Sequence, residues 1–113
     1  MGNQSTLLDV ETVQPDIPIE DQINRCRRNI MVHSVVYYVF NDNLISDSEY
    51  DFWGQRLIFL QAAYPEASEN TPYMLEEFRT FSGTTSGFNL PLEDPWAQRT
   101  ARWLLHIRNE RSK

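Results

Sequence analysis

Acidic and aromatic side chains are concentrated in one short stretch of the sequence, residues 43–53, which reads NLISDSEYDFW. Asp47 and Asp51 stand four residues apart, with Tyr50 between them. Residues spaced i and i+4 on a helix face the same side, so both carboxylates can point at one ligand. Carboxylates accept hydrogen bonds from hydroxyl and amide groups and favour positive charge nearby. The stretch is therefore a candidate binding site.

A tyrosine pair precedes this stretch, in the run VVYYVF at residues 35–40. The turn signal at residues 41–43 predicts that the chain reverses there and brings the pair close to Tyr50. Phenol rings present a negative π-face that stacks on flat cations, and an oxidised nicotinamide ring is a flat cation carrying an amide and a ribose. The candidate site residues are Tyr37, Tyr38, Asp47, Tyr50 and Asp51.

The same stretch is also explained without any ligand. Ser46 and Glu49 have the S-x-x-E spacing of a capping box, and Ile45 and Tyr50 stand at the flanking staple positions. Acidic side chains in the first turn also favour the positive end of the helix dipole. From pattern alone, a helix start and a ligand site both stay open.

The elements that must position these residues are helical, and the predicted fold class is all-α. An apolar stripe through Ile23, Cys26, Ile30 and Tyr37 predicts a helix over about 18–40. Arg25, Arg27 and Arg28 are expected on its other side, and Asp16 is a candidate cap. The run at 35–40 is rich in strand-favouring residues, but its continuity with the stripe favours helix.

A second helix, antiparallel to the first, is predicted over about 46–64, where Pro65 stops it. A short helical turn is expected from Thr71-Pro72 through Phe78. Asp94 followed by Pro95 predicts a C-terminal helix over about 95–110. We expect residues 1–15 to form a flexible N-terminal arm and residues 16–113 to form a single domain.

Composition narrows the function classes. The 113 residues carry a net charge of −6, which disfavours direct binding to nucleic acid. No apolar run approaches a membrane span, and the lone cysteine, Cys26, fits a reducing cytoplasm. His33 and His106 lack ligand-spaced neighbours, so no metal site is predicted.

The run YYVFNDNLISDSEYD, followed by LIFLQAAYPE and TP, resembles the Ia domain of bacterial NAD-dependent DNA ligases. The resemblance covers about residues 20–72. In that family the domain binds the nicotinamide mononucleotide (NMN) half of NAD during enzyme adenylation. The resemblance implies NAD or NMN as the bound ligand, with the first tyrosine contact at Tyr37, the acidic residue at Asp47, the stacking ring at Tyr50 and the final carboxylate at Asp51.

Two departures from the family pattern bear on function. The family pattern has histidine or tyrosine after the first tyrosine, usually histidine, which helps the phosphate end of the ligand. This chain has Tyr38, which brings no positive charge. Arg27, Arg28 or backbone N–H groups of the loop 82–87 are candidate replacements. The only lysine is Lys113, outside any K-x-D-G motif, so the chain by itself is not expected to catalyse ligation, and no catalytic residue is predicted.

Two functions follow from the resemblance. The first is a stand-alone nicotinamide-nucleotide-binding module without ligase machinery, of the kind encoded by bacteriophages. The second is a phage-type interaction or inhibitor protein that kept the Ia fold and binds a protein of its bacterial host, such as a ligase, a nuclease or a defence factor. Hydrolysis of the nicotinamide–ribose bond by the paired carboxylates is a third alternative, which release of free nicotinamide would reveal.

Overall fold

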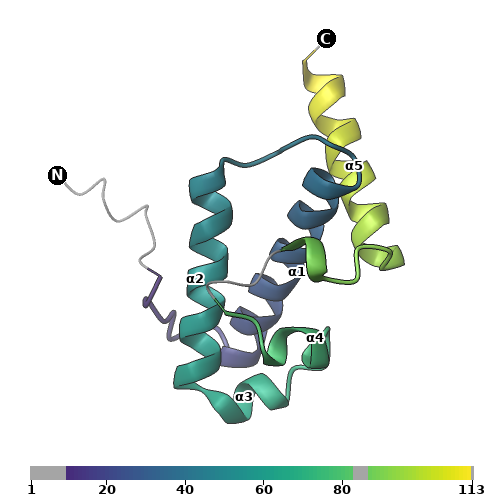
Figure 1. Ribbon diagram of the computed structural model, residues 1–113. Coiled ribbons are helices and arrows are strands. Elements are labelled where there is room, and N and C mark those ends of the chain that lie inside the picture. Colours follow the sequence, from purple (N-terminus) through teal and green to yellow (C-terminus); the bar gives the residue numbers. More distant parts are fainter. Residues whose placement is uncertain (1–9, 83–86, 113) are drawn as a thin grey trace, which may run out of the picture.

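The computed structural model describes residues 10–82 and 87–112, and within these ranges every regular element is a helix (Figure 1). The three long helices are α1 (Ile19–Tyr38), α2 (Asp47–Ala63) and α5 (Pro95–Arg111). The predicted all-α class, the antiparallel pair and the C-terminal helix are thereby confirmed. In this part of the chain, no helix has the length and apolar character that crossing a membrane requires.

Three short elements connect α2 to α5. They are α3 (Pro65–Glu69), α4 (Leu75–Arg79) and the 3-10 turn η2 (Gly87–Asn89). Pro65 ends α2 as predicted, but it also begins α3, because the fixed φ of proline suits the first helical position. The helical turn expected from Thr71-Pro72 starts later, at Leu75, after the left-handed Met74.

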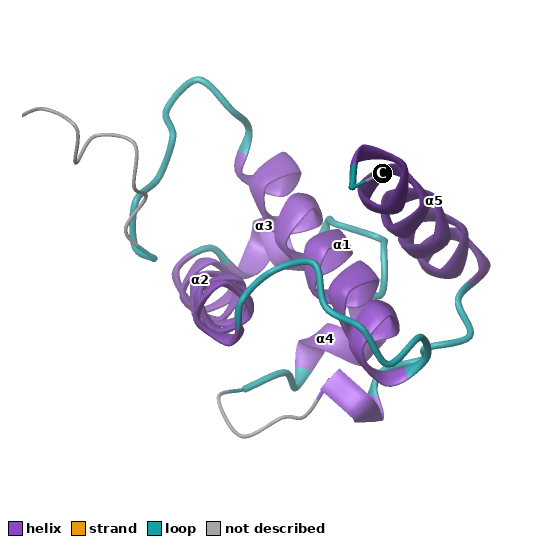
Figure 2. Ribbon diagram, turned by 90° about the horizontal axis from the view of Figure 1, so that it is seen from above, coloured by secondary structure: helices purple, strands orange, loops and turns teal. Residues whose placement is uncertain are grey.

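Helix α1 lies between α2 and α5 and contacts both (Figure 2). Its stripe residues Ile23, Cys26 and Ile30 are buried, as predicted, and join residues of α2, α4 and α5 in the core. Tyr37 continues the same stripe but is 54% exposed, because the last turn of α1 borders an open corner rather than the core. The strand-favouring run stays helical through Tyr38.

The start of α1 differs from the prediction. The N-cap is Pro18, with no side-chain cap, so the expected Asp16 cap is wrong. Instead, the Gln22 side-chain amide donates to the carbonyl oxygens of Gln14 (3.0 Å) and Ile17 (2.8 Å). The described end of the expected N-terminal arm is thus hydrogen-bonded to α1, whereas residues 1–9 lie outside the described residues.

Arg27 is the main correction to the predicted helix faces, because it is fully buried rather than exposed. Its guanidinium donates to the carbonyl oxygens of Thr71 (2.7 Å), Ser68 (3.1 Å) and Tyr73 (3.1 Å). It also donates to the side-chain oxygen of Gln61 in α2 (3.1 Å). One cation therefore fastens α1 to α2 and to the irregular segment after it.

Arg28 also has a structural role, because it contacts aromatic rings outside α1. Its guanidinium lies 4.0 Å from the ring centroid of Tyr73 and 4.5 Å from that of Trp96. The Tyr73 hydroxyl donates to Asp94 (3.0 Å), which also caps α5 by accepting the Ala97 N–H (2.9 Å). Stacking on arginine therefore ties α1 to the beginning of α5.

We expect Arg27→Ala to lower the free energy of unfolding by about 3 kcal/mol or more, because it empties a buried site and removes the donor to the carbonyl oxygens of Thr71 and Tyr73. Urea unfolding followed by circular dichroism measures the change. Arg79→Ala is the matched control, since its ion pairs with Glu69 and Glu76 are exposed. That control should have little effect on stability, because exposed ion pairs contribute little. Equal losses in the two variants would contradict the role assigned to Arg27.

Candidate functional site

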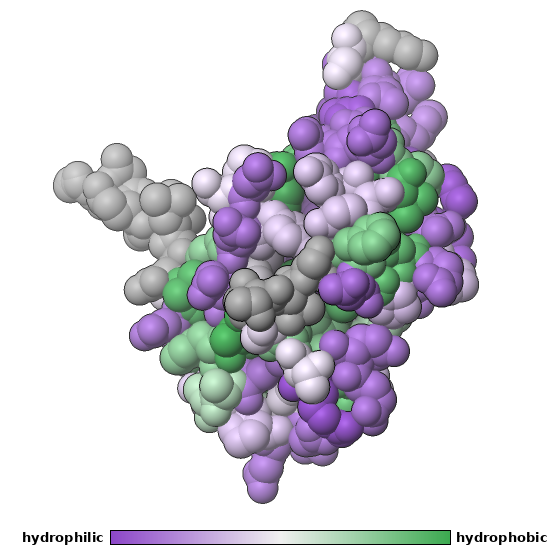
Figure 3. Space-filling view, viewed as in Figure 1, coloured by the Kyte–Doolittle hydropathy of each residue, from purple (hydrophilic) through white to green (hydrophobic). Residues whose placement is uncertain are grey.

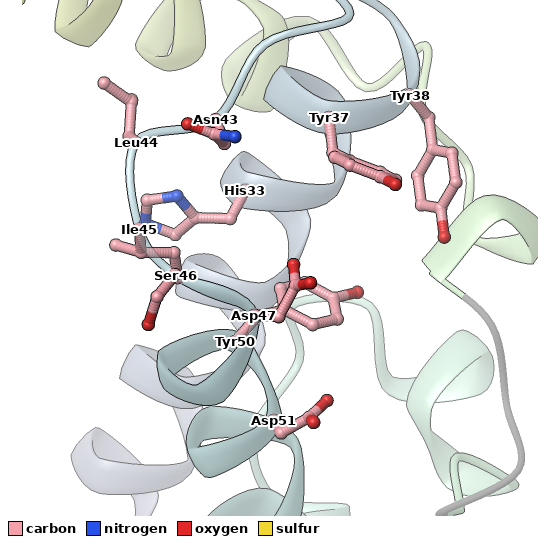
Figure 4. Close-up of a pocket in the computed structure, with 10 residues that line it drawn as sticks. All are labelled: His33, Tyr37, Tyr38, Asn43, Leu44, Ile45, Ser46, Asp47, Tyr50 and Asp51. Atoms are coloured by element: carbon pink, nitrogen blue, oxygen red, sulfur yellow. The ribbon is translucent and has the colours of Figure 1, made fainter.

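A pocket of about 320 Å³ opens at the corner where α1 ends and α2 begins (Figure 4). This volume is at the low end of the range of about 300–1,000 Å³ for small-molecule sites. All five residues singled out in the sequence line it. The complete lining is His33, Tyr37, Tyr38, Asn43, Leu44, Ile45, Ser46, Asp47, Tyr50 and Asp51.

The acidic side of the pocket is set by the first turn of α2. Ser46 Oγ accepts the Glu49 N–H (3.1 Å), and the Glu49 carboxylate accepts the Ser46 N–H (3.0 Å). The predicted capping box is therefore confirmed. Because it determines where α2 starts, it also determines where Asp47 and Asp51 project, and both are exposed at the pocket. The same residues therefore begin helix α2 and line the pocket.

Tyr50 is the fixed aromatic residue of the pocket. Its hydroxyl forms a 2.8 Å hydrogen bond with Ser34 Oγ of α1, so it bridges the two helices. Burial raises the pKa of Tyr50, against the smaller opposing effect of the Ser34 hydrogen bond, and the phenol is neutral at physiological pH. The hydrogen bond to Ser34 therefore fixes the orientation of the Tyr50 ring.

Gly87 packs directly against the hydrogen bond between Ser34 and Tyr50. A Cβ atom at Gly87 would overlap the Tyr50 hydroxyl and would lie 2.6 Å from Ser34 Oγ. Glycine is needed here for space, so that the η2 backbone can approach the Ser34–Tyr50 hydrogen bond closely. The pocket thus depends on a segment far along the chain from the helices that line it.

The tyrosine pair forms the opposite wall, at the end of α1 (Figure 4). Tyr37 and Tyr38 are 54% and 39% exposed, and their rings meet edge to face with centroids 4.8 Å apart. Tyr38 also meets Phe88 of η2 edge to face, at 5.5 Å. The aromatic wall therefore continues from α1 into the C-terminal half of the chain.

His33 is the pocket residue that sequence reasoning missed, because it was considered only as a metal ligand. It stands one helical turn before Tyr37, at the i−4 position, and this spacing was the signal that could have found it. His33 Nδ1 is buried and has no hydrogen-bond partner among the described residues. Burial lowers the pKa of His33, against a smaller opposing effect of Glu49, so the imidazole is neutral near pH 7. Buried polar atoms normally have partners, so an unpaired nitrogen beside a cavity is unusual.

The arginines expected to reach a phosphate do not reach the pocket. Arg27 is buried among carbonyl oxygens and Arg28 is stacked between Tyr73 and Trp96, so that expectation is wrong for both. Most of the loop 82–87, the other candidate, lies outside the described residues. Within residues 10–82 and 87–112, the pocket lining contains neither arginine nor lysine. Over the same ranges, no three His, Cys, Asp or Glu side chains gather where a metal ion could bind.

Comparison with known proteins identifies the helix pair. A family described as "DNA ligase-like, N-terminal NAD+-binding domain" matches residues 14–72, which is just over half of the chain. The chain belongs to this family. The matched residues contain α1, α2 and the complete lining of the pocket, whereas η2 and α5 lie outside the match.

Relatives of this ligase-like domain are DNA ligases that are much longer than the chain. The DNA ligase of Thermotoga petrophila is 46% identical over 46 residues, which are 41% of this chain and 7% of that protein. The DNA ligase of Pseudothermotoga lettingae is 39% identical over 69 residues, which are 55% of this chain and 10% of that protein. The comparison with solved structures finds no match.

We expect Gly87→Ala to disrupt the Ser34–Tyr50 hydrogen bond, because the added methyl group takes the space of the two hydroxyls. Overpacking of this kind costs about 1–3 kcal/mol of folding stability. Thermal unfolding measures the loss. Gly54→Ala is the matched control, since a Cβ there would meet only ring atoms of Phe81, at 3.8 Å or more. A Gly87 variant as stable as the Gly54 variant would contradict the close approach.

The lowered pKa of His33 predicts a dependence of stability on pH. As the pH falls below about 6.5, the unfolded imidazole takes up a proton before the folded one does, so the free energy of unfolding decreases. Urea unfolding between about pH 7.5 and 5 measures this slope. His33→Gln should flatten it, whereas His106→Gln, at an exposed position of α5, should leave it unchanged. Identical slopes in wild type and His33→Gln would overturn the assignment.

Proposed function

We propose that this chain is a nicotinamide-nucleotide-binding module, which binds NMN or the NMN half of NAD in the corner pocket. The observation that carries the proposal is the pocket itself, where acidic side chains of α2 face the tyrosine pair of α1 in a chain of an NAD+-binding domain family. The five predicted contact residues all contribute to its lining.

The chemistry of the lining suits the nicotinamide and ribose groups. The exposed faces of Tyr37 and the fixed ring of Tyr50 offer π-surfaces to a flat pyridinium. The carboxylates of Asp47 and Asp51 complement its positive charge and can accept hydrogen bonds from ribose hydroxyls. His33 Nδ1 offers one further buried hydrogen-bonding position.

The proposal covers binding and no covalent step. The relatives are named DNA ligases, but the chain spans only 7% to 10% of their length. Residues 1–112 contain no lysine, so neither the helix pair nor α5 carries a residue of the type that takes AMP in the family. We therefore propose a role without ligase catalysis, in the bacterial cytoplasm where NAD is held.

Isothermal titration calorimetry with NMN and with NAD tests this proposal. We expect saturable binding to the folded wild-type chain. The double variant Asp47→Asn, Asp51→Asn should weaken binding by roughly tenfold or more, because it removes both negative charges while preserving shape. Glu93→Gln, which changes an exposed carboxylate away from the pocket, is the matched control.

No heat at millimolar NMN or NAD, with circular dichroism showing folded protein, would overturn the binding proposal. Equal affinity of the double variant and the wild type would show that the ligand binds elsewhere. Release of free nicotinamide during incubation with NAD would replace the binding role by hydrolysis of the nicotinamide–ribose bond.

The second candidate is an interaction protein that binds a bacterial host protein, and exposed aromatic residues favour it. Phe88 and Trp103 are 65% and 60% exposed. Figure 3 shows hydrophobic residues along the side of the molecule formed by α5, below its hydrophilic C-terminal end. Capture of a ligase, nuclease or defence factor that survives Asp47→Ala and Asp51→Ala but not Trp103→Ala would support this function over nucleotide binding.

A further inference from the structure

We infer that the chain binds NAD as a whole dinucleotide, with the adenine ring stacked on Phe88 of η2. The inference rests on the proposed function, which places the nicotinamide half in the corner pocket, and adds a second subsite, for a purine base, just outside that pocket. It follows from an aromatic row, Tyr37, Tyr38 and Phe88, that leads out of the pocket onto a segment outside the family match.

The three rings of the aromatic row follow one another from the pocket to η2. Tyr37 and Tyr38 line the pocket and meet with ring centroids 4.8 Å apart, and Phe88 continues from Tyr38 at 5.5 Å. The exposed fraction of Phe88, at 65%, is the highest of the three. Figure 4 shows the two tyrosines at the edge of the pocket away from Leu44. Because Phe88 lies outside the pocket lining, the row extends the aromatic surface beyond the cavity.

The backbone of η2 holds Phe88 in this place. Gly87 is buried against the hydrogen bond between Ser34 and Tyr50. Leu90 is buried in the core, and its N–H donates to the Gly87 carbonyl oxygen (3.2 Å). The residues on both sides of Phe88 therefore anchor the segment, whereas its ring contributes little to the core. The fold presents this ring to solvent from a fixed position.

The volume of the pocket requires part of a dinucleotide to lie outside it. The cavity of about 320 Å³ is at the low end of the range for small-molecule sites. NAD joins two nucleotides of similar size, so a cavity that suits the nicotinamide half has no room for the AMP half. The surface next to the opening then decides whether that half is bound or stays in solvent. Phe88 lies next to Tyr38, which borders the opening.

Adenine is the part of NAD that an exposed phenyl ring suits. A nucleobase stacks its flat π-face on an aromatic side chain, and this contact needs no hydrogen bond to the edge of the base. The charged diphosphate between the two halves would pass Tyr38, which is partly exposed and leaves it in contact with water. The order of the protein rings thus matches the order of groups in NAD, from nicotinamide at Tyr37 to adenine at Phe88.

The experiment compares NAD and NMN by calorimetry on the wild-type chain and on variants of Phe88. We expect NAD to bind wild type at least about fivefold more tightly than NMN, because only NAD has a base to stack. Phe88→Ala should remove most of this advantage and leave the affinity for NMN unchanged. Phe88→Tyr retains an aromatic ring and should keep the preference for NAD.

Trp103→Ala is the matched control for loss of an exposed aromatic side chain. Trp103 is 60% exposed, stacks on His106 of the same helix and lies outside the pocket lining. Its removal should change neither affinity. Circular dichroism and thermal unfolding establish that each variant is folded before titration.

A measurement on the wild-type chain keeps the test independent of any variant that does not fold. Saturation-transfer difference NMR reports which ligand protons touch the protein. We expect transfer to the adenine H2 and H8 protons of NAD as well as to the nicotinamide protons. Transfer to the nicotinamide protons alone would overturn the inference and leave the proposed function standing.

The titrations also separate failure of the inference from failure of the proposed function. NAD that binds wild type no more tightly than NMN would overturn the inference alone. An advantage of NAD that persists in Phe88→Ala would overturn the assignment of Phe88. An equal loss of NMN and NAD affinity in Phe88→Ala would show that this ring supports the pocket rather than adenine. Absence of binding by both ligands would overturn the inference and the proposed function together.

Discussion

The buried guanidinium of Arg27 is the interaction on which the arrangement of helices depends. A fully buried cation is costly unless its N–H groups are satisfied, and here carbonyl oxygens from the segment 68–73 and the amide of Gln61 provide the acceptors. Two of these bonds go to the carbonyl oxygens of Thr71 and Tyr73, in the irregular segment that follows α3. Because α1 carries His33, Tyr37 and Tyr38, fixing α1 against α2 also fixes one wall of the pocket.

The pocket is the place where local and long-range constraints meet. The capping box determines where α2 begins and therefore where its carboxylates project. The Ser34–Tyr50 hydrogen bond then joins α2 to α1, and Gly87 allows η2 to pack beside that bond. The family match ends at residue 72, yet η2 contributes Phe88 beside Tyr38. This chain therefore builds part of its pocket surroundings with a segment outside the shared helix pair.

The electrostatic character of the pocket differs from a general nucleotide site, in which positive groups face phosphate. Among the described residues, arginines serve the fold: Arg27 binds carbonyl oxygens, Arg28 stacks on aromatic rings and Arg108 neutralises Asp42. The carboxylates are left to face the cavity. A pocket with aromatic walls and exposed carboxylates complements a flat cation, which is the basis of the proposed ligand.

The sequence by itself determined the all-α class, the limits of the long helices, the capping box and the five residues that meet at one pocket. These features follow from spacing and turn chemistry within a few residues, which local patterns report directly. Only the tertiary structure decided that Arg27 is buried, that Arg28 is stacked on Tyr73 and Trp96, that His33 Nδ1 lacks a partner and that Gly87 packs against Tyr50. Each of these depends on partners tens of residues away or on the packing around a whole side chain, and helical periodicity carries no information about either.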